Sequence, residues 1–97
     1  MFTYIGVIHK DHNSDYGVSF PDFPGCITAG NTIEEAKRMA YEALLFHIEG
    51  MLEDSEKLPM PSKLEEIVRN DDFADGVAFL IVSVPESVHS DRLQMVA

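Results

Sequence analysis

Cysteine, positive charge and long apolar runs are all scarce in this sequence. Cys26 is the only cysteine among 97 residues, so an internal disulfide is impossible and the cysteine pairs of common zinc sites are missing. Lysine and arginine number 7 against 17 aspartates and glutamates, which gives a net charge of −10 at pH 7. Nucleic acids and anionic membrane surfaces are bound through basic side chains, so neither is an expected partner. A basic protein is favoured instead, because opposite fields speed encounter.

The sequence also shows neither a membrane-spanning segment nor a secretory signal. No apolar run approaches the ~20 residues of a membrane-spanning helix. The first residues, Met1-Phe2-Thr3-Tyr4, lack the basic stretch and following apolar segment of a secretory signal. With 97 residues and a hydrophobic fraction of 45%, the sequence predicts one folded cytoplasmic domain.

Four segments have the pattern of β-strands. Large residues occupy both faces of residues 2–9, and residues 16–20 alternate after a polar turn, which predicts a β-hairpin. Residues 26–29 form a short third strand that Gly30 closes. The longest apolar run, Val77 to Val84, is rich in valine and predicts a central strand buried on both faces.

A long helix is predicted after Thr32. In a capping box, the Thr32 hydroxyl accepts from the Glu35 N–H while the Glu35 carboxylate reaches back to the Thr32 N–H. Apolar residues then recur on one helical face, so we expect a helix from Ile33 to about Leu52 that packs on a sheet. Its predicted inner face consists of Ile33, Ala36, Ala40, Ala43, Leu44 and His47.

A second, shorter helix follows an extended segment. Residues 58–61, Leu-Pro-Met-Pro, must be extended because a residue before proline avoids the α region. The four residues from Ser62 to Glu65 offer another capping box, for a helix that ends near Arg69. The predicted order is β-β-β-α-(short α)-β. This order indicates an α+β fold in which a helix packs on a sheet.

No cluster of titratable side chains points to catalysis or metal binding. His9 and His12 flank a polar loop with no third ligand, and Cys26 at the start of a strand fits a small buried residue better than a nucleophile. The acids of the predicted loops are expected to be solvated: Asp11, Asp15, Asp22, Asp71, Asp72 and Asp75. We therefore expect no enzyme activity, no catalytic, cofactor-binding or metal-binding residue, and no cofactor.

Two segments carry a family resemblance. The first is Phe20-Pro21-Asp22-Phe23-Pro24-Gly25-Cys26-Ile27-Thr28-Ala29-Gly30-Asn31-Thr32, continuing into Glu34-Glu35-Ala36, and the second is Leu58-Pro59-Met60-Pro61-Ser62. Together they closely resemble the signature of the HicB family of antitoxins. Asn31 stands where aspartate is common, a modest change because asparagine also tolerates turns. With the predicted strands, the resemblance covers residues 1–84 as a HicB-like antitoxin domain.

The resemblance implies a partial RNase H-like fold, with the helix on a small mixed sheet, in a type II toxin–antitoxin system. It also implies a HicA-like partner, a small basic ribonuclease toxin that cleaves mRNA and is neutralised by occlusion. The chain is expected to form a homo-oligomer of two or four copies.

Many family members carry a C-terminal DNA-binding domain, and nothing after Val84 could build one. No direct nucleic-acid binding is therefore expected of this chain. Residues 85–97 are predicted to be a tail, either an edge strand or the stub of a linker to a missing DNA-binding domain. The alternative function is an orphan or truncated transcriptional autoregulator of a toxin–antitoxin operon.

Most signature residues are expected to be scaffold. Pro21, Pro24 and Gly25 would fix the turn, and Gly30, Thr32 and Glu35 would set the start of the helix. Phe23, between two prolines, is either tucked onto the sheet edge or offered as an anchor, and aromatics are common among interface hot spots. We predict that Asp22 and Phe23 contact a basic toxin, and that Phe23→Ala weakens toxin binding with little loss of fold.

Overall fold

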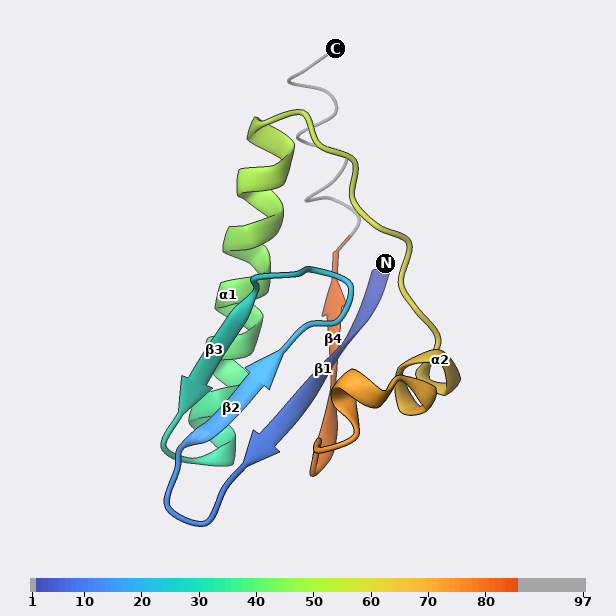
Figure 1. The fold of residues 1–97 in the computed structure, drawn as a ribbon. Helices are drawn as coiled ribbons and strands as arrows, with labels where there is room; N and C mark the ends of the chain where they lie inside the picture. The colour runs from blue at the N-terminus through green and yellow to red at the C-terminus, as the bar shows by residue number, and fades with distance from the viewer. Residues whose placement is uncertain (1, 86–97) are drawn as a thin grey trace.

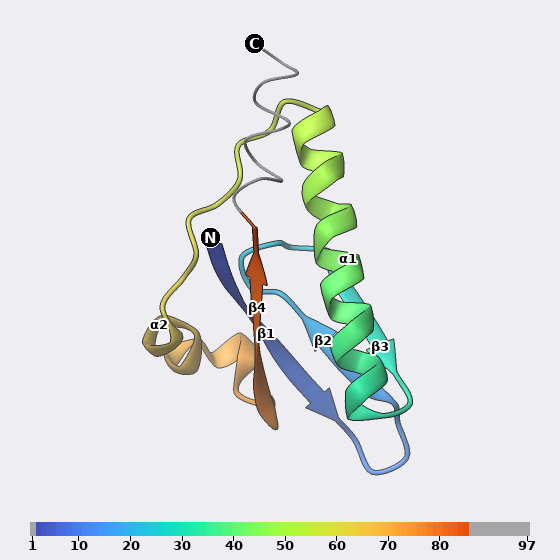
Figure 2. The same ribbon diagram turned by 180° about the vertical axis from the view of Figure 1, so that it is seen from behind.

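A four-stranded sheet with one long helix across one of its faces makes up the fold (Figures 1 and 2). The computed structural model describes residues 2–85, so residues 86–97 of the predicted tail lie outside the described residues. In chain order the elements are β1 (Phe2–Lys10), β2 (Tyr16–Ser19), β3 (Ile27–Gly30), α1 (Ile33–Glu53), α2 (Leu64–Arg69), the short 3-10 helix η1 (Asp71–Phe73) and β4 (Ala78–Val84). The predicted α+β class and element order are confirmed.

The strands lie in the order β3-β2-β1-β4, and every pairing is antiparallel. The sheet is therefore not mixed, contrary to the prediction. The expectation of a central strand at 77–84 is also wrong, because within the described residues β4 pairs with β1 alone. Its outward side chains Phe79 and Ile81 are 43% and 70% exposed. A continuous apolar run shows that neither face of the strand carries charge, but it does not show that other elements cover both faces.

The hydrogen bonds at the start of α1 match the predicted capping box except for one partner of Glu35. The Thr32 hydroxyl accepts a hydrogen bond from the Glu35 N–H at 3.0 Å, as in a capping box. The Glu35 carboxylate accepts from the N–H of Asn31, at 3.1 Å, rather than from that of Thr32. Glu34 and Glu35 also place negative charge at the positive end of the helix dipole. The helix therefore begins at Ile33 as predicted.

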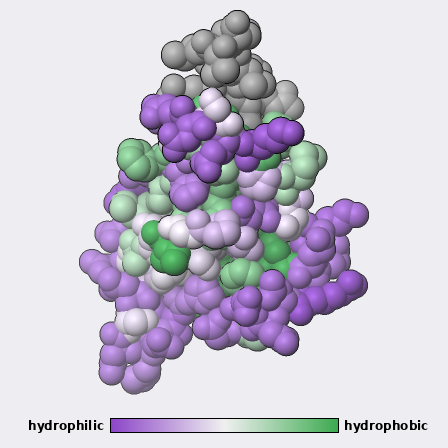
Figure 3. Space-filling model, turned by 45° about the horizontal axis from the view of Figure 1, so that its top comes forward, coloured by the Kyte–Doolittle hydropathy of each residue, from purple (hydrophilic) through white to green (hydrophobic). Residues whose placement is uncertain are grey.

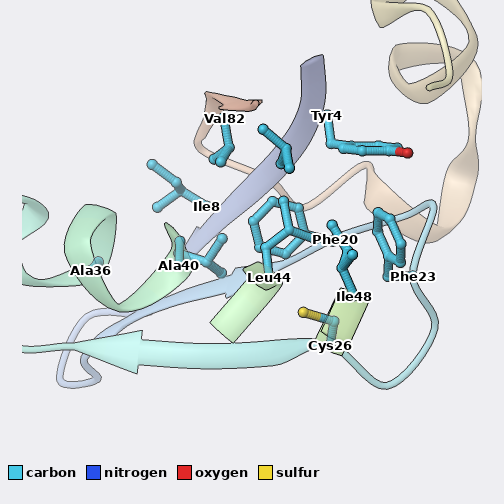
Figure 4. Packing of buried hydrophobic residues seen from close by; sticks show 12 residues of the cluster. Tyr4, Ile8, Phe20, Phe23, Cys26, Ala36, Ala40, Leu44, Ile48 and Val82 are labelled. Atoms are coloured by element: carbon cyan, nitrogen blue, oxygen red, sulfur yellow. The ribbon is translucent and has the colours of Figure 1, made fainter. Parts of the chain in front are cut away.

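The hydrophobic core lies between α1 and the inner face of the sheet (Figure 4). The helix contributes a stripe of residues four apart: Ala36, Ala40, Leu44 and Ile48. The prediction that Ile33 belongs to the inner face is wrong, because Ile33 is the first residue of the helix and its side chain is 53% exposed. Ala43 and His47 are half-buried. The sheet supplies Tyr4, Ile8, Val18, Val82 and Val84 to the same core.

The short helix α2 begins one residue later than the predicted capping box. Lys63 is its N-cap, and the Lys63 N–H donates to the carboxylate of Glu66 at 3.2 Å. The predicted partner of that cap, Glu65, is not used, and the Ser62 side chain bonds elsewhere in the fold. The Ser62 hydroxyl therefore makes a long-range hydrogen bond instead of capping α2.

Candidate functional site

The signature turn between β2 and β3 is closed by its own backbone. The Phe23 N–H donates to the Phe20 carbonyl at 3.0 Å, and the Cys26 N–H donates to the Phe23 carbonyl at 2.9 Å. The Phe20 N–H returns to the Cys26 carbonyl at 3.2 Å. Gly25 has φ +89°, a left-handed conformation that costs little only for glycine. The turn therefore needs a glycine at this position.

Asp22 ties this turn to the second signature segment. Its carboxylate accepts from the Ser62 N–H at 2.8 Å and from the Ser62 hydroxyl. Both residues are half-buried, and hydrogen bonds to an ionised acceptor are about twice as strong as neutral ones. The two halves of the signature, far apart in the sequence, are thus joined in the fold.

A second tie runs from β1 to the same segment. The Tyr4 hydroxyl donates to the Pro59 carbonyl at 2.8 Å. Burial raises the pKa of the Tyr4 hydroxyl above its ordinary value, and the negative charge of Asp22 raises it further. Both effects favour the neutral hydroxyl, which is the form that donates this hydrogen bond. The segment from Leu58 to Ser62 is therefore held at two points.

Phe23 lies in the core and not on the surface. Its side chain is 1% exposed, and its ring meets Tyr4 edge-on at a centroid distance of 4.7 Å (Figure 4). A second edge-on contact joins it to His47 at 5.8 Å. This burial contradicts the expectation that Phe23 is an exposed anchor whose loss would spare the fold. The hydrogen bonds of the Phe23 N–H and carbonyl within the turn hold its backbone in this place.

Gly30 lies where the chain passes from β3 into α1. A Cβ at this position would lie 2.4 Å from the backbone nitrogen of Ala36. No side chain larger than hydrogen fits there without moving the first turn of the helix. The close approach of β3 and α1 therefore accounts for the glycine.

Sequence reasoning missed a row of three polar side chains. Ser19 Oγ lies 2.9 Å from His9 Nε2, and His9 Nδ1 lies 3.3 Å from a carboxylate oxygen of Asp75. The order serine, histidine, aspartate matches that of a hydrolytic triad. However, Ser19 pairs with strands on both sides and the next N–H, of Phe20, donates to a carbonyl. The Phe20 N–H, which follows the serine, is therefore not free to stabilise an oxyanion at Ser19.

The other candidate chemistries also find no support in the described residues. Cys26 is buried, and that burial raises the pKa of its thiol, whereas a reactive cysteine needs a lowered one. No three metal-ligating side chains lie together anywhere in residues 2–85. Over the same range, no helix combines the length and apolarity that crossing a membrane requires.

Comparison with known proteins gives consistent matches. Residues 4–96 match the family model of the HicB-like antitoxins of bacterial toxin–antitoxin systems. Antitoxin HicB 1 of Photorhabdus laumondii is 52% identical over 46 residues, which cover 47% of this chain and 30% of that protein. Antitoxin HicB of Escherichia coli K12 is 45% identical over 49 residues, covering 50% of this chain and 36% of that one.

Solved structures agree with the sequence matches. The crystal structure of the Burkholderia pseudomallei antitoxin HicB superposes with a TM-score of 0.80 at 35% identity, covering 91% of this chain and 67% of that one. A HicA3–HicB3 toxin–antitoxin complex contains a chain that superposes with a TM-score of 0.71 at 26% identity, covering 87% of this chain and 99% of that one. The chain spans only about a third of the length of the two curated antitoxins above.

Proposed function

The chain belongs to the HicB-like antitoxin family, and from this premise we propose that it binds a HicA-type ribonuclease toxin and neutralises it by occlusion. Residues 1–84 would form the antitoxin domain. The observation that carries the proposal is the likeness, at 26% identity, to a chain of a HicA3–HicB3 toxin–antitoxin complex. The mechanism is steric and electrostatic, and it requires no chemistry from the antitoxin itself.

The distribution of charge supports a basic partner. The whole chain carries −10, and acids crowd the C-terminal end of α1 and the turn after it, where Glu49, Asp54 and Glu56 are exposed. The last turn of α1 holds no basic residue. Negative charge in the last turn of a helix opposes the helix dipole and costs about 0.3–1 kcal/mol. A basic surface docked there would remove that cost and gain from the opposite charge.

Asp22 is expected to act in this function indirectly, by holding the two signature segments together. Its carboxylate already holds Ser62, so it shapes the surface formed by the two signature segments. Half-buried, it keeps part of its surface accessible to a partner. A direct contact of Asp22 with the toxin stays a prediction, while Phe23 would support that surface from below.

The proposal is tested by co-expressing this chain with the small basic reading frame adjacent to its gene. We expect the chain to rescue growth from the toxin and to co-elute with it in size-exclusion chromatography. A toxic neighbour that is neither bound nor neutralised would contradict the proposal. Glu49→Lys together with Asp54→Lys should weaken the complex, whereas Glu65→Lys together with Asp72→Lys, at exposed positions elsewhere, is the matched double charge reversal.

A further inference from the structure

Phe46 lies on the face of α1 that is turned away from the sheet. It stands midway between the buried Leu44 and Ile48, which places it on the opposite side of the helix from the core stripe. Its side chain is 81% exposed, more than any other large apolar side chain in residues 2–85. Figure 2 shows α1 in front of the sheet, so this face points toward the viewer. Scattered apolar patches also occur on the surface shown in Figure 3, so the exposure of Phe46 alone does not indicate a site.

Gly50 lies one turn further along the same face. Glycine within a helix lowers its stability relative to alanine. Within the described structure the glycine meets no need of the fold, because its φ is not positive and an added Cβ would find no atom beyond its own stretch of helix within 4 Å. Such a glycine is typical of a place where another molecule comes close to the backbone. Phe46 and Gly50 therefore present a projecting ring beside a bare stretch of helix.

Acidic side chains flank this pair. Glu42 lies four residues before Phe46 and Glu49 three residues after it, so all three share one helical face. Both glutamates are exposed, and in residues 2–85 neither pairs with a base. The bases of the same helix, Lys37 and Arg38, lie about two turns nearer its N-terminal end. The surface around Phe46 is therefore negative with an apolar centre.

We propose that this outer face of α1, made up of Glu42, Phe46, Glu49 and Gly50, binds an arginine of the basic toxin. The guanidinium of that arginine lies over the Phe46 ring and between the two carboxylates, and the toxin segment that carries it passes over Gly50. The inference rests on the proposed function, because it takes the toxin as the partner.

The chemistry of this face favours arginine over other occupants. A guanidinium is planar, so it stacks on an aromatic ring and also donates two parallel hydrogen bonds to a carboxylate. The ammonium of lysine has no flat face with which to stack. A nucleic acid, an acidic protein or a second copy of this chain would bring negative charge against Glu42 and Glu49. A wholly apolar partner would bury the two carboxylates without a counter-charge.

The role of Phe46 is tested by titration calorimetry of the full chain with the toxin encoded beside its gene. Phe46→Ala should weaken binding about 30-fold or more, as expected of an interface hot spot, and should leave stability almost unchanged. Ile27→Ala is the matched control, because Ile27 is 71% exposed on β3. Phe46→Leu keeps an apolar side chain but removes the ring, so it should lose nearly as much affinity as Phe46→Ala. Wild-type affinity for Phe46→Leu would overturn the stacked arginine.

Gly50→Ala separates a role in binding from a role in the fold. The added Cβ should raise the unfolding midpoint of the free chain, because alanine suits a helix better than glycine. The same atom should weaken toxin binding about tenfold, since it occupies the space into which the toxin packs. Opposite changes in stability and affinity are not expected of a glycine that serves the fold alone. Unchanged affinity in Gly50→Ala would overturn the close approach of the toxin to this residue.

The two carboxylates should act mainly on the rate of association. Glu42→Gln together with Glu49→Gln should slow association and reduce its dependence on salt, whereas Phe46→Ala should mainly speed dissociation. Glu65→Gln together with Asp72→Asn removes the same charge at exposed positions elsewhere. An equal effect of this control pair would assign the steering to net charge and overturn the role of Glu42 and Glu49.

The proposed function and this interface fail in different ways. A wild-type chain that does not bind the toxin contradicts the proposed function, and the interface with it. Tight binding that neither Phe46→Ala nor Gly50→Ala weakens contradicts the outer face of α1 alone.

Discussion

Asp22 accepts two hydrogen bonds from Ser62, one from the backbone N–H at 2.8 Å and one from the hydroxyl, across a separation of 40 residues. The contact joins the turn that follows β2 to the segment that precedes α2. The Tyr4 hydroxyl holds the same segment through the Pro59 carbonyl. The two signature segments therefore form one structural unit.

Removing the Asp22 charge should destabilise this unit. We expect Asp22→Asn to lower the free energy of unfolding by about 1.5–3 kcal/mol, the range for hydrogen bonds to charged groups. Ser62→Ala, which leaves the backbone N–H in place, should cost about 1 kcal/mol. Urea titration of both single variants and the double variant gives the coupling energy. Asp15→Asn, in the exposed turn between β1 and β2, should change little, and an equal loss there would contradict the assignment.

Phe23→Ala should destabilise the fold and not merely a binding surface. The side chain is 1% exposed and packs against Tyr4 and His47, so its removal leaves a cavity in the core. We expect a loss of about 3–5 kcal/mol in denaturant titration. Phe23→Leu keeps most of the volume and should lose less than half as much. Ile27→Ala, at an exposed position nearby in the sequence, should have almost no effect.

Two glycines should respond in opposite directions to alanine. At Gly30 the new Cβ would lie 2.4 Å from the Ala36 nitrogen, so Gly30→Ala should cost about 3 kcal/mol or more. At Gly50, within α1, nothing lies within 4 Å of the new atom. Gly50→Ala should therefore stabilise the protein by about 0.5–1 kcal/mol. Thermal unfolding of both variants is sufficient, and destabilisation by Gly50→Ala would show that α1 needs its glycine for another reason.

Stability should fall at alkaline pH because of Tyr4. Its pKa in the folded state lies above the ordinary value, so the folded chain holds this proton more tightly than the unfolded chain. The resulting stabilisation is complete below the unfolded pKa of about 10 and is lost as the pH rises through the folded pKa. Absorbance of tyrosinate should show Tyr4 titrating at higher pH than in unfolded protein. Tyr4→Phe removes that transition, while Tyr41→Phe, at a 40% exposed position, should leave it.

Local patterns predicted what local interactions decide. The Thr32 cap and the start of α1 follow from a hydroxyl and an N–H three residues apart, and the structure has both. The position of β4 in the sheet could not be predicted in this way, because whether a strand is central or at the edge depends on which other strands pair with it in the complete fold. Its apolar sequence suits either place, and only the strand order decides.

The candidate site was predictable only in part for the same reason. Resemblance identified both signature segments, but no local rule shows that Ser62 would donate to Asp22 in place of capping α2. The residues around Phe23 are compatible with either a buried or an exposed side chain, so the sequence could not decide between the two. The row from Ser19 through His9 to Asp75 comes from three separate segments, so its members share no spacing that a motif search could detect.

The pairing of β1 with β4 also has a consequence for synthesis. Thr3 lies opposite Ser83, 80 residues further along the chain, so β1 is synthesised long before its partner strand β4. Until β4 emerges, β1 has one bare edge, and the core lacks Val82 and Val84. Pairings between such distant residues form slowly, because the closure of a long loop precedes any gain in contacts. A newly made chain therefore reaches this fold only after β4 has been synthesised, so an activity that needs the complete sheet cannot appear before then.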